Sequence, residues 1–375
     1  MPSAARRSWT PAAVLALGAA GVIALVPGPA RADWVWGFFA GAAMQRSRLC
    51  FAGAVRDAVL FRALQMGRAI LMLLAGSVAA GWWAAARHAA AGLGHHGYWA
   101  AITPGVVAGA FLFGTGMVLA GGCLAGSLWR LGEGQAAYLW TVAGWAAGSG
   151  LGRLLLPLPE RLDQLHRGLA LPDVLGLPGS AALSLAVLGG GILGLALWDR
   201  RQPAVGEELP QTGGAGAAGA RWRRLLRAPW PPEAGALMTA ALAGAYLALT
   251  GRTWSLTPAL AAPGRATAFA AGLVLGGFAG AALGHELRWR RPLTARDAGL
   301  RAAGGLLMGF GAWISLGCTV GALIGGMASF SLHAWVWMLS AVAGGVGGSW
   351  LLLSVGRPGA RPASPGQGVS REQGV

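Results

Sequence analysis

Long apolar stretches, separated by short polar segments that carry most of the arginines, extend along almost the whole chain. A helix needs about 20 residues to cross the hydrocarbon core of a bilayer, and several of these stretches are shorter or are interrupted by glycine. The pattern predicts an all-α polytopic membrane protein in which some segments form discontinuous or re-entrant helices. The stretches cover residues 12–26, 34–45, 66–86, 104–122, 138–156, 181–198, 235–250, 266–284, 303–325 and 334–355.

The composition agrees with a membrane protein. Hydrophobic residues make up 55% of the chain and charged residues 11%, with a mean hydropathy of +0.55. Soluble domains carry about 25% charged residues. The sequence contains no lysine, so arginine supplies every positive charge behind the net charge of +16. These arginines are spread between the apolar stretches rather than gathered in one basic domain, which favours cytoplasmic loops facing membrane lipid over a nucleic-acid partner.

The chain divides into two halves joined by a basic linker. We expect a first repeat over residues 34–199, a Gly/Ala-rich linker over 200–233, a second repeat over 234–356 and a disordered tail over 357–375. Residues 1–33 contain two arginines, an apolar run and a small-residue site, a pattern that cleaved signal peptides share with uncleaved first membrane helices. We favour the uncleaved helix, because a polytopic protein can insert through its own helices.

Three cysteines stand in glycine-rich apolar segments. Two of these segments overlay without a gap and share a GCxxG element, which in one copy comprises Gly122, Cys123 and Gly126 and in the other Gly317, Cys318 and Gly321. One copy lies in each half, and its glycines permit close backbone approach, so the repeat predicts a cysteine-lined site between the halves. An odd number of cysteines without a CxxC pair suggests neither a disulfide framework nor a zinc ribbon. We expect no bound metal and no cofactor.

The third cysteine, Cys50, lies in an arginine-rich segment two residues after Arg48. In one interpretation Arg48 attracts an anion whose softer end contacts the thiol; the alternative is an interfacial loop with snorkelling arginines. Arg252 is the counterpart of Arg48 in the second half, where no cysteine follows, so the site should hold three thiols rather than four. Arg130 and Glu133, three residues apart, are placed either to pair at a helix end or to guide an anion.

Thiols together with free backbone N–H groups suit a ligand that has a polarizable sulfur and anionic oxygens, such as thiosulfate. Cu(I) also suits thiolates, but His95 and His96 lie far along the chain from any cysteine. No G-x-S-x-G, H-E-x-x-H, Walker or dinucleotide fingerprint occurs, so we expect a transporter rather than an enzyme. Two alternatives stay open: a membrane sulfurtransferase that keeps sulfur as a persulfide on Cys50 or Cys318, and a membrane subunit in which the cysteines only pack.

Three segments, RSRLCFAGAVRD, FGTGMVLAGGCLAGSLWRLGEGQ and GFGAWISLGCTVGALIGGMASFSLHAW, resemble the signature segments of the YeeE/YedE family of sulfur transporters. The resemblance covers most of residues 34–355. It implies an inverted-repeat helical fold and uptake of thiosulfate, or a related sulfur compound, across the bacterial inner membrane. It also implies that Cys50, Cys123 and Cys318 line a narrow midplane path and relay the anion through transient hydrogen bonds. Some members are linked to selenium metabolism, so a selenium compound is an alternative substrate.

The expected binding residues are therefore the three cysteines, Arg48 and the four glycines of the GCxxG elements, with no catalytic residue among them. The expected partners are a small inorganic sulfur anion and membrane lipid. A cytoplasmic sulfur-carrier protein that accepts the anion is a further partner to be tested.

Overall fold

A computed structural model describes residues 28–92, 97–156, 168–199, 228–257, 264–287 and 294–355. The expected first membrane segment over 12–26, most of the basic linker and the C-terminal tail lie outside these residues, and so do His95 and His96.

The described chain is helical, with one isolated antiparallel bridge between Ala170 and Ser331 as the only β pairing in those ranges. The helices are η1 (Gly28–Ala30), α2 (Arg31–Arg46), α3 (Phe51–Phe61), α4 (Gln65–Ala90), α5 (Pro104–Ala120), α6 (Leu124–Gly132), α7 (Tyr138–Leu155), α9 (Leu171–Asp199), α11 (Pro232–Thr250), α12 (Arg265–Leu283), α13 (Ala295–Ile314), η2 (Thr319–Gly325), α14 (Gly326–Ala328) and α15 (Leu332–Val355). The predicted all-α class is confirmed.

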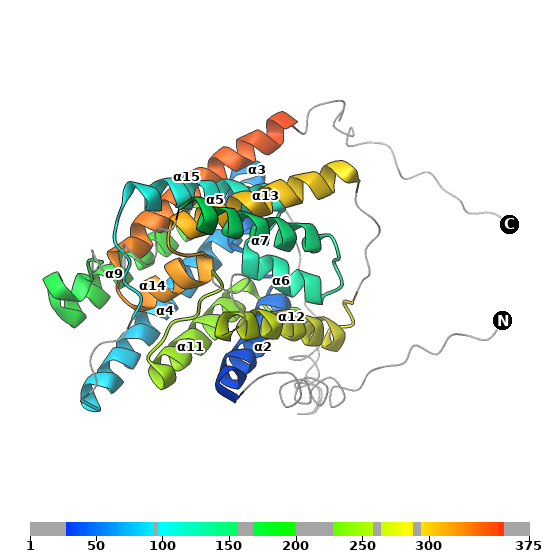
Figure 1. Ribbon diagram of the computed structural model, residues 1–375. Coiled ribbons are helices and arrows are strands. Elements are labelled where there is room, and N and C mark those ends of the chain that lie inside the picture. Colours follow the sequence, from blue (N-terminus) through cyan, green and yellow to red (C-terminus); the bar gives the residue numbers. More distant parts are fainter. Residues whose placement is uncertain are drawn as a thin grey trace, which may run out of the picture.

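The number and length of the hydrophobic helices are those of a polytopic membrane protein. Within the described ranges, six segments are long and apolar enough to cross a bilayer, and one further crossing arises if α13 continues through η2 and α14. The axis bends by 47° between α13 and that continuation. The apolar stretch predicted over 303–325 is therefore a discontinuous helix. Figure 1 shows α9 at the margin of the bundle, where most of its length is exposed.

Glycines bring the helix backbones into direct contact. On α2, Gly37 and Gly41 are spaced four apart and face α12, where a Cβ atom on either would lie 2.2–2.3 Å from a backbone oxygen. On α12, Gly272 and Gly276 return the same contact against α2. Such small-xxx-small faces let membrane helices approach closely, where van der Waals contact replaces the hydrophobic effect. The pair α7 and α13 packs in the same way, through Gly144 and Gly148 on one helix and Gly305 and Gly309 on the other.

Four of the closest pairings between the two halves form two equivalent sets. α2 packs on α12 while α11 packs on α4, and α7 packs on α13 while α15 packs on α5 (Figure 1). The central helices α5 and α13 contact one another and run antiparallel, with Gly109 against Gly311 and Gly116 against Gly304. Opposite directions of equivalent helices are what an inverted repeat requires; the inverted repeat itself stays a prediction.

Polar contacts fix both ends of α2. At its start, the buried Asp33 accepts hydrogen bonds from the Tyr246 hydroxyl of α11 and, at 2.6 Å, from Arg265 Nε of α12. At its end, Arg46 Nη1 lies 3.4 Å from the Glu286 carboxylate beyond α12. The backbone contacts between these ends make α2 and α12 one packed unit, from which the adjoining site residues are positioned.

Replacing Gly276 by Ala should destabilise the protein by about 1–3 kcal/mol, because the added methyl group overpacks a backbone contact. Its Cβ would lie 1.9 Å from the Phe38 carbonyl oxygen. The measurement is the thermal midpoint of the purified protein in detergent. Gly189→Ala on α9 is the matched control, since nothing lies within 4 Å of its Cβ position; equal midpoints for the two variants would contradict the packing argument.

Candidate functional site

All three cysteines occupy the same structural position: each is the residue that immediately precedes a helix. Cys50 precedes α3, Cys123 precedes α6 and Cys318 precedes η2, and all three have extended backbone. Each is also buried, with at most 5% of its surface exposed. The glycine-rich cysteine segments are thus the breaks of discontinuous helices, as the sequence predicts.

The three breaks share one backbone conformation. Two residues before each cysteine the chain passes through the left-handed region, at Arg48 (φ 54°), Gly121 (φ 76°) and Leu316 (φ 58°). This conformation ends the preceding helix, and it is unusual for residues other than glycine. A fourth break follows α11 at Gly251 (φ 66°), which takes the place of Arg48. The expected match of Arg252 with Arg48 is therefore displaced by one residue.

Side chains from the following helices hold the two GCxxG breaks. Tyr138, the first residue of α7, donates its hydroxyl to the Gly121 carbonyl at 3.2 Å. In the second half, His333 Nε2 at the start of α15 lies 3.0 Å from the Ser315 carbonyl. Carbonyl groups at a buried helix end need such partners, because unpaired ones are costly in an apolar interior.

Cys50 and Cys123 meet over Gly126. A Cβ atom added to Gly126 would lie 3.4 Å from Cys50 Sγ and 3.5 Å from Cys123 Sγ. Residues far apart in sequence therefore bring two thiols to one point, and the absence of a side chain at Gly126 leaves the space beside both of them open. Of the predicted site residues, Gly122 lies close by, where its added Cβ would be 2.7 Å from Arg130 Nη1.

Arg130 belongs to this thiol cluster. Its Nη1 donates to Cys50 Sγ at 3.5 Å and to the Gly121 carbonyl at 3.3 Å, and its guanidinium covers the Trp129 ring at 4.6 Å. The pairing of Arg130 with Glu133 that the sequence suggests is wrong. Glu133 caps the C-terminal end of α6, and its carboxylate is bound by another arginine.

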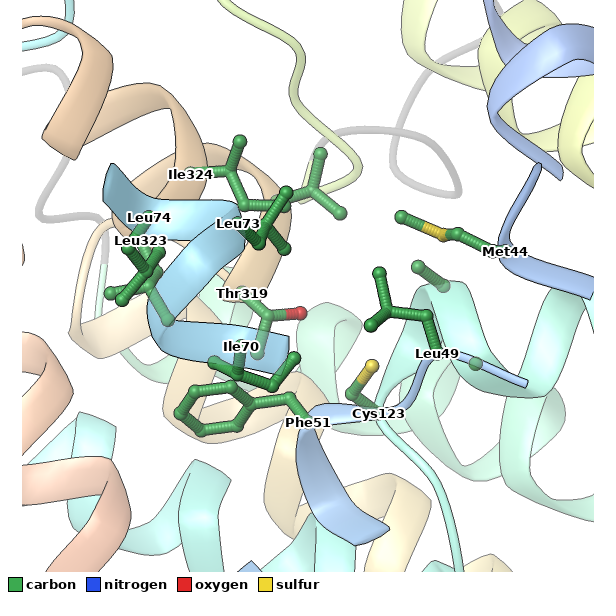
Figure 2. A pocket seen from close by; sticks show the side chains of 13 residues that line it. Met44, Leu49, Phe51, Ile70, Leu73, Leu74, Cys123, Thr319, Leu323 and Ile324 are labelled. Atoms are coloured by element: carbon green, nitrogen blue, oxygen red, sulfur yellow. The ribbon is translucent and has the colours of Figure 1, made fainter. Parts of the chain in front are cut away.

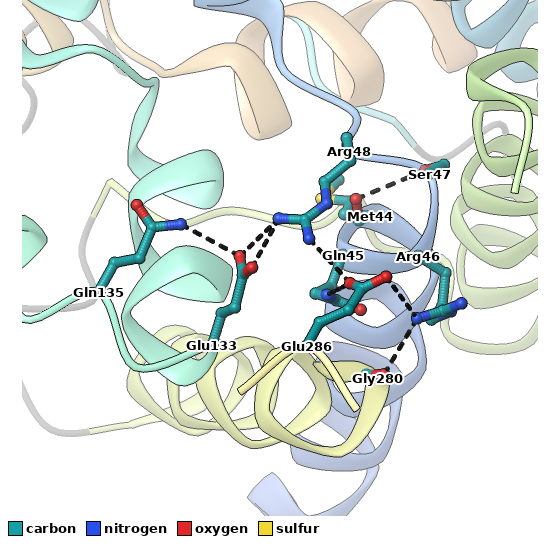
Figure 3. Close-up of polar contacts among 9 residues, drawn as sticks. All are labelled: Met44, Gln45, Arg46, Ser47, Arg48, Glu133, Gln135, Gly280 and Glu286. Atoms are coloured by element: carbon teal, nitrogen blue, oxygen red, sulfur yellow. Dashed lines mark hydrogen bonds and ion pairs between the residues drawn. The ribbon is translucent and has the colours of Figure 1, made fainter. Parts of the chain in front are cut away.

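That other arginine is Arg48. Its Nη1 donates to both oxygens of Glu133 at 2.7 Å, and its Nη2 donates to Glu286 at 2.8 Å (Figure 3). Gln135 supports Glu133 at 3.2 Å, and Gln45 supports Glu286 at 2.9 Å. Arg48 therefore joins α6 to the segment after α12 and is neutralised by two carboxylates. The sequence analysis missed Glu286, which is 238 residues from Arg48 and is given by no local spacing.

A cavity of about 30 Å³ opens beside Cys123. Its walls are mostly apolar, and two polar side-chain groups, the Cys123 thiol and the Thr319 hydroxyl, line it near one another (Figure 2). By the same measure one water molecule needs about 10–15 Å³, so this conformation admits about two waters and no tetrahedral anion. The lining residues are Met44, Leu49, Phe51, Ile70, Leu73, Leu74, Cys123, Ala125, Gly126, Thr319, Val320, Leu323 and Ile324.

The second GCxxG element is placed differently. Cys318 is fully buried and does not line the cavity, although the residue after it does. Gly317 lies against Ala322 of its own segment, while Gly321 faces the backbone of Trp254 and the side chain of Ser255. The structure thus gathers Cys50, Cys123, Gly122 and Gly126 at one place, whereas the contacts described for Arg48, Gly317 and Gly321 lie with other residues.

Comparisons with known proteins agree on a family. The family model described as sulphur transport matches residues 46–347. The chain is 27% identical to the thiosulfate transporter TsuA of Spirochaeta thermophila, over 84% of this chain and 97% of that protein. It is 28% identical to the thiosulfate transporter TsuA of Escherichia coli, over 85% and 93% respectively. A probable transporter, YedE of Salmonella typhimurium, is 37% identical over 29% of this chain and 26% of that protein.

Replacing Glu133 by Gln should lower stability by about 1–3 kcal/mol, because hydrogen bonds to a charged partner are lost from a buried carboxylate. The control is Asp57→Asn, which breaks the more exposed pair with Arg56 and should change stability by less than about 1 kcal/mol. Denaturation of both variants in detergent measures the difference. A Glu133 variant as stable as the Asp57 variant would show that the Arg48 contacts contribute little.

Proposed function

The chain belongs to the sulphur transport family, and from this premise we propose that it takes up thiosulfate, or a related sulfur-containing anion, through a cysteine-lined path. It is a multi-pass membrane protein and a sulfur transporter. We place it in the inner membrane of a bacterium, with the arginine-rich connections on the cytoplasmic side. The names of its two full-length relatives support thiosulfate as the substrate.

The observation that carries this proposal is the meeting of Cys50 and Cys123 over Gly126. A thiol is a weak donor with a polarizable sulfur, and it suits the soft terminal sulfur of thiosulfate better than a carboxylate or an amide does. Weak contacts also serve transport, because an anion that enters a site has to leave it again. Cys318 would extend the same relay beyond the cavity, where it precedes Thr319.

Arg130 supplies the electrostatic part of the proposal. Its guanidinium lies against Cys50, and in the described part of the chain no carboxylate lies within ion-pair distance of it. A positive charge at this depth attracts an anion towards the thiols, and the thiols rather than the arginine make the first contact in the cavity. Since the cavity admits about two waters, passage of the anion requires its walls to separate.

Cys50→Ala and Cys123→Ala should each reduce uptake of labelled thiosulfate into proteoliposomes at least about tenfold, and Cys318→Ala should reduce it as well. A hydrogen bond to a charged group is worth about 1.5–3 kcal/mol, and 1.4 kcal/mol corresponds to a factor of ten. Normal membrane content of each variant is the control.

Full uptake by the Cys123 variant would overturn the relay. Intact-mass measurement after exposure to thiosulfate separates transport from sulfur transfer, because a persulfide on Cys50 or Cys318 adds the mass of one sulfur atom. We expect the mass to stay unchanged.

Gly126→Ala should block the path while leaving the fold intact. The added methyl group would contact both sulfur atoms at ordinary distances of 3.4 and 3.5 Å, so it covers the thiols without a clash. We expect uptake to fall at least about tenfold, on the same conversion of a lost contact into a rate, with an unchanged thermal midpoint. Gly150→Ala on α7 is the control, since its Cβ position has nothing within 4 Å; equal uptake by both variants would place the path elsewhere.

A further inference from the structure

Thr319 presents a buried hydroxyl group with no hydrogen-bond partner. The residue is 5% exposed, and its Oγ1 makes no hydrogen bond of standard geometry, although the Cys123 thiol lies beside it. Among the buried polar side-chain atoms without partners in the described ranges, it is the one that lines the cavity. An unsatisfied buried hydroxyl costs about 1–3 kcal/mol, so its presence calls for an explanation.

Hydroxyl groups on the helices of this protein usually bond to the carbonyl four residues earlier. Ser127 donates to Cys123, Thr239 donates to Gly235, and Thr250 donates to Tyr246, at 2.7–2.9 Å. Thr319 is the first residue of η2 and has no helical turn before it. Its hydroxyl is therefore directed into the cavity instead of onto its own backbone, as Figure 2 shows.

The other polar side chain that lines the cavity is Cys123, whose thiol lies near the Thr319 hydroxyl (Figure 2). The remaining lining side chains are aliphatic, aromatic or thioether groups, with Leu73, Phe51 and Met44 among them. The cavity thus offers one soft donor and one hard donor side by side. A ligand that satisfies both needs a polarizable atom at one end and an oxygen acceptor at the other.

We propose that the Thr319 hydroxyl binds an oxygen of the transported anion while Cys123 contacts its sulfur, which makes Thr319 a specificity-determining residue. This inference rests on the proposed function. The two groups together orient the anion. In the reversed orientation an oxygen of the anion would lie against the thiol and its sulfur against the hydroxyl, and neither pair matches. A site built to bond an oxygen discriminates against analogues that lack it, since the hydroxyl then stays buried and unpaired.

Thr319→Val and Thr319→Ser separate this role from packing. Valine keeps the shape of threonine and removes the hydroxyl, whereas serine keeps the hydroxyl. We expect Thr319→Val to raise the KM for labelled thiosulfate in proteoliposomes at least about tenfold, the effect of one lost hydrogen bond. Thr319→Ser should stay within about threefold of the unchanged protein, because it loses only a methyl contact. Thr141→Val on α7 is the matched control: it removes another buried hydroxyl that lacks a partner, away from the cavity, and should leave the KM unchanged.

Thermal unfolding of the purified protein gives a second readout, in which the variant should be more stable than the unchanged protein without thiosulfate and should gain less from its addition. Without thiosulfate, Thr319→Val should melt at a higher temperature than the unchanged protein, because an unpaired buried hydroxyl has been removed. With thiosulfate, it should gain less stabilisation than the unchanged protein does. A merely structural threonine predicts a lower midpoint and an unaffected KM.

The outcomes distinguish the two proposals. If the unchanged protein takes up no thiosulfate, the proposed function fails. If the unchanged protein transports thiosulfate and Thr319→Val does so with the same KM, the function stands and the role of Thr319 is overturned.

Discussion

Every break in a membrane helix leaves backbone carbonyl and N–H groups without helical partners, and this protein depends on satisfying them in an apolar interior. At the first GCxxG break the Gly121 carbonyl accepts hydrogen bonds from Arg130 and Tyr138. The neighbouring Ala120 carbonyl accepts one from Arg301 at 2.9 Å. At the second, His333 lies against the Ser315 carbonyl. Glycine contacts between helices bring these partners within reach, because larger residues would hold the backbones apart.

The two GCxxG breaks have the same backbone conformation, but different side chains surround them. The first is surrounded by guanidinium groups, since Arg130 and Arg301 both lie over the Tyr138 ring at 5.5 and 4.4 Å. The second is held by His333, which is buried among neutral side chains. One of these is Trp337, whose indole N–H donates to the Ser315 hydroxyl at 3.1 Å. An anion approaching the cavity therefore meets positive charge on one side only. Two similar halves thus create a site with a direction.

The sequence predicted the features that depend on local pattern. Apolar spacing indicated the helices, and short, glycine-interrupted segments indicated breaks in them, but the left-handed residue before each cysteine was not predicted. It failed where a long-range partner decided the outcome. The i, i+3 rule offered Arg130 and Glu133 as a pair, but the Glu133 carboxylate is bound by Arg48, a partner from a distant segment. Thr319 was overlooked because a threonine in an apolar segment ordinarily bonds to its own backbone, and only the break at Cys318 prevents this.

The arrangement of charge explains why thiols and a hydroxyl, rather than arginines, face the cavity. In a medium of low dielectric constant a free guanidinium binds a divalent anion strongly, and strong binding prevents release. The arginines near the cavity already have partners. Arg48 is neutralised by Glu133 and Glu286. Arg130 donates hydrogen bonds to the Gly121 carbonyl and the Cys50 sulfur. Neutral donors then make the direct contacts. Attraction and release are thus assigned to different side chains, so a mutation that moves a free positive charge into the cavity would improve binding at the expense of turnover.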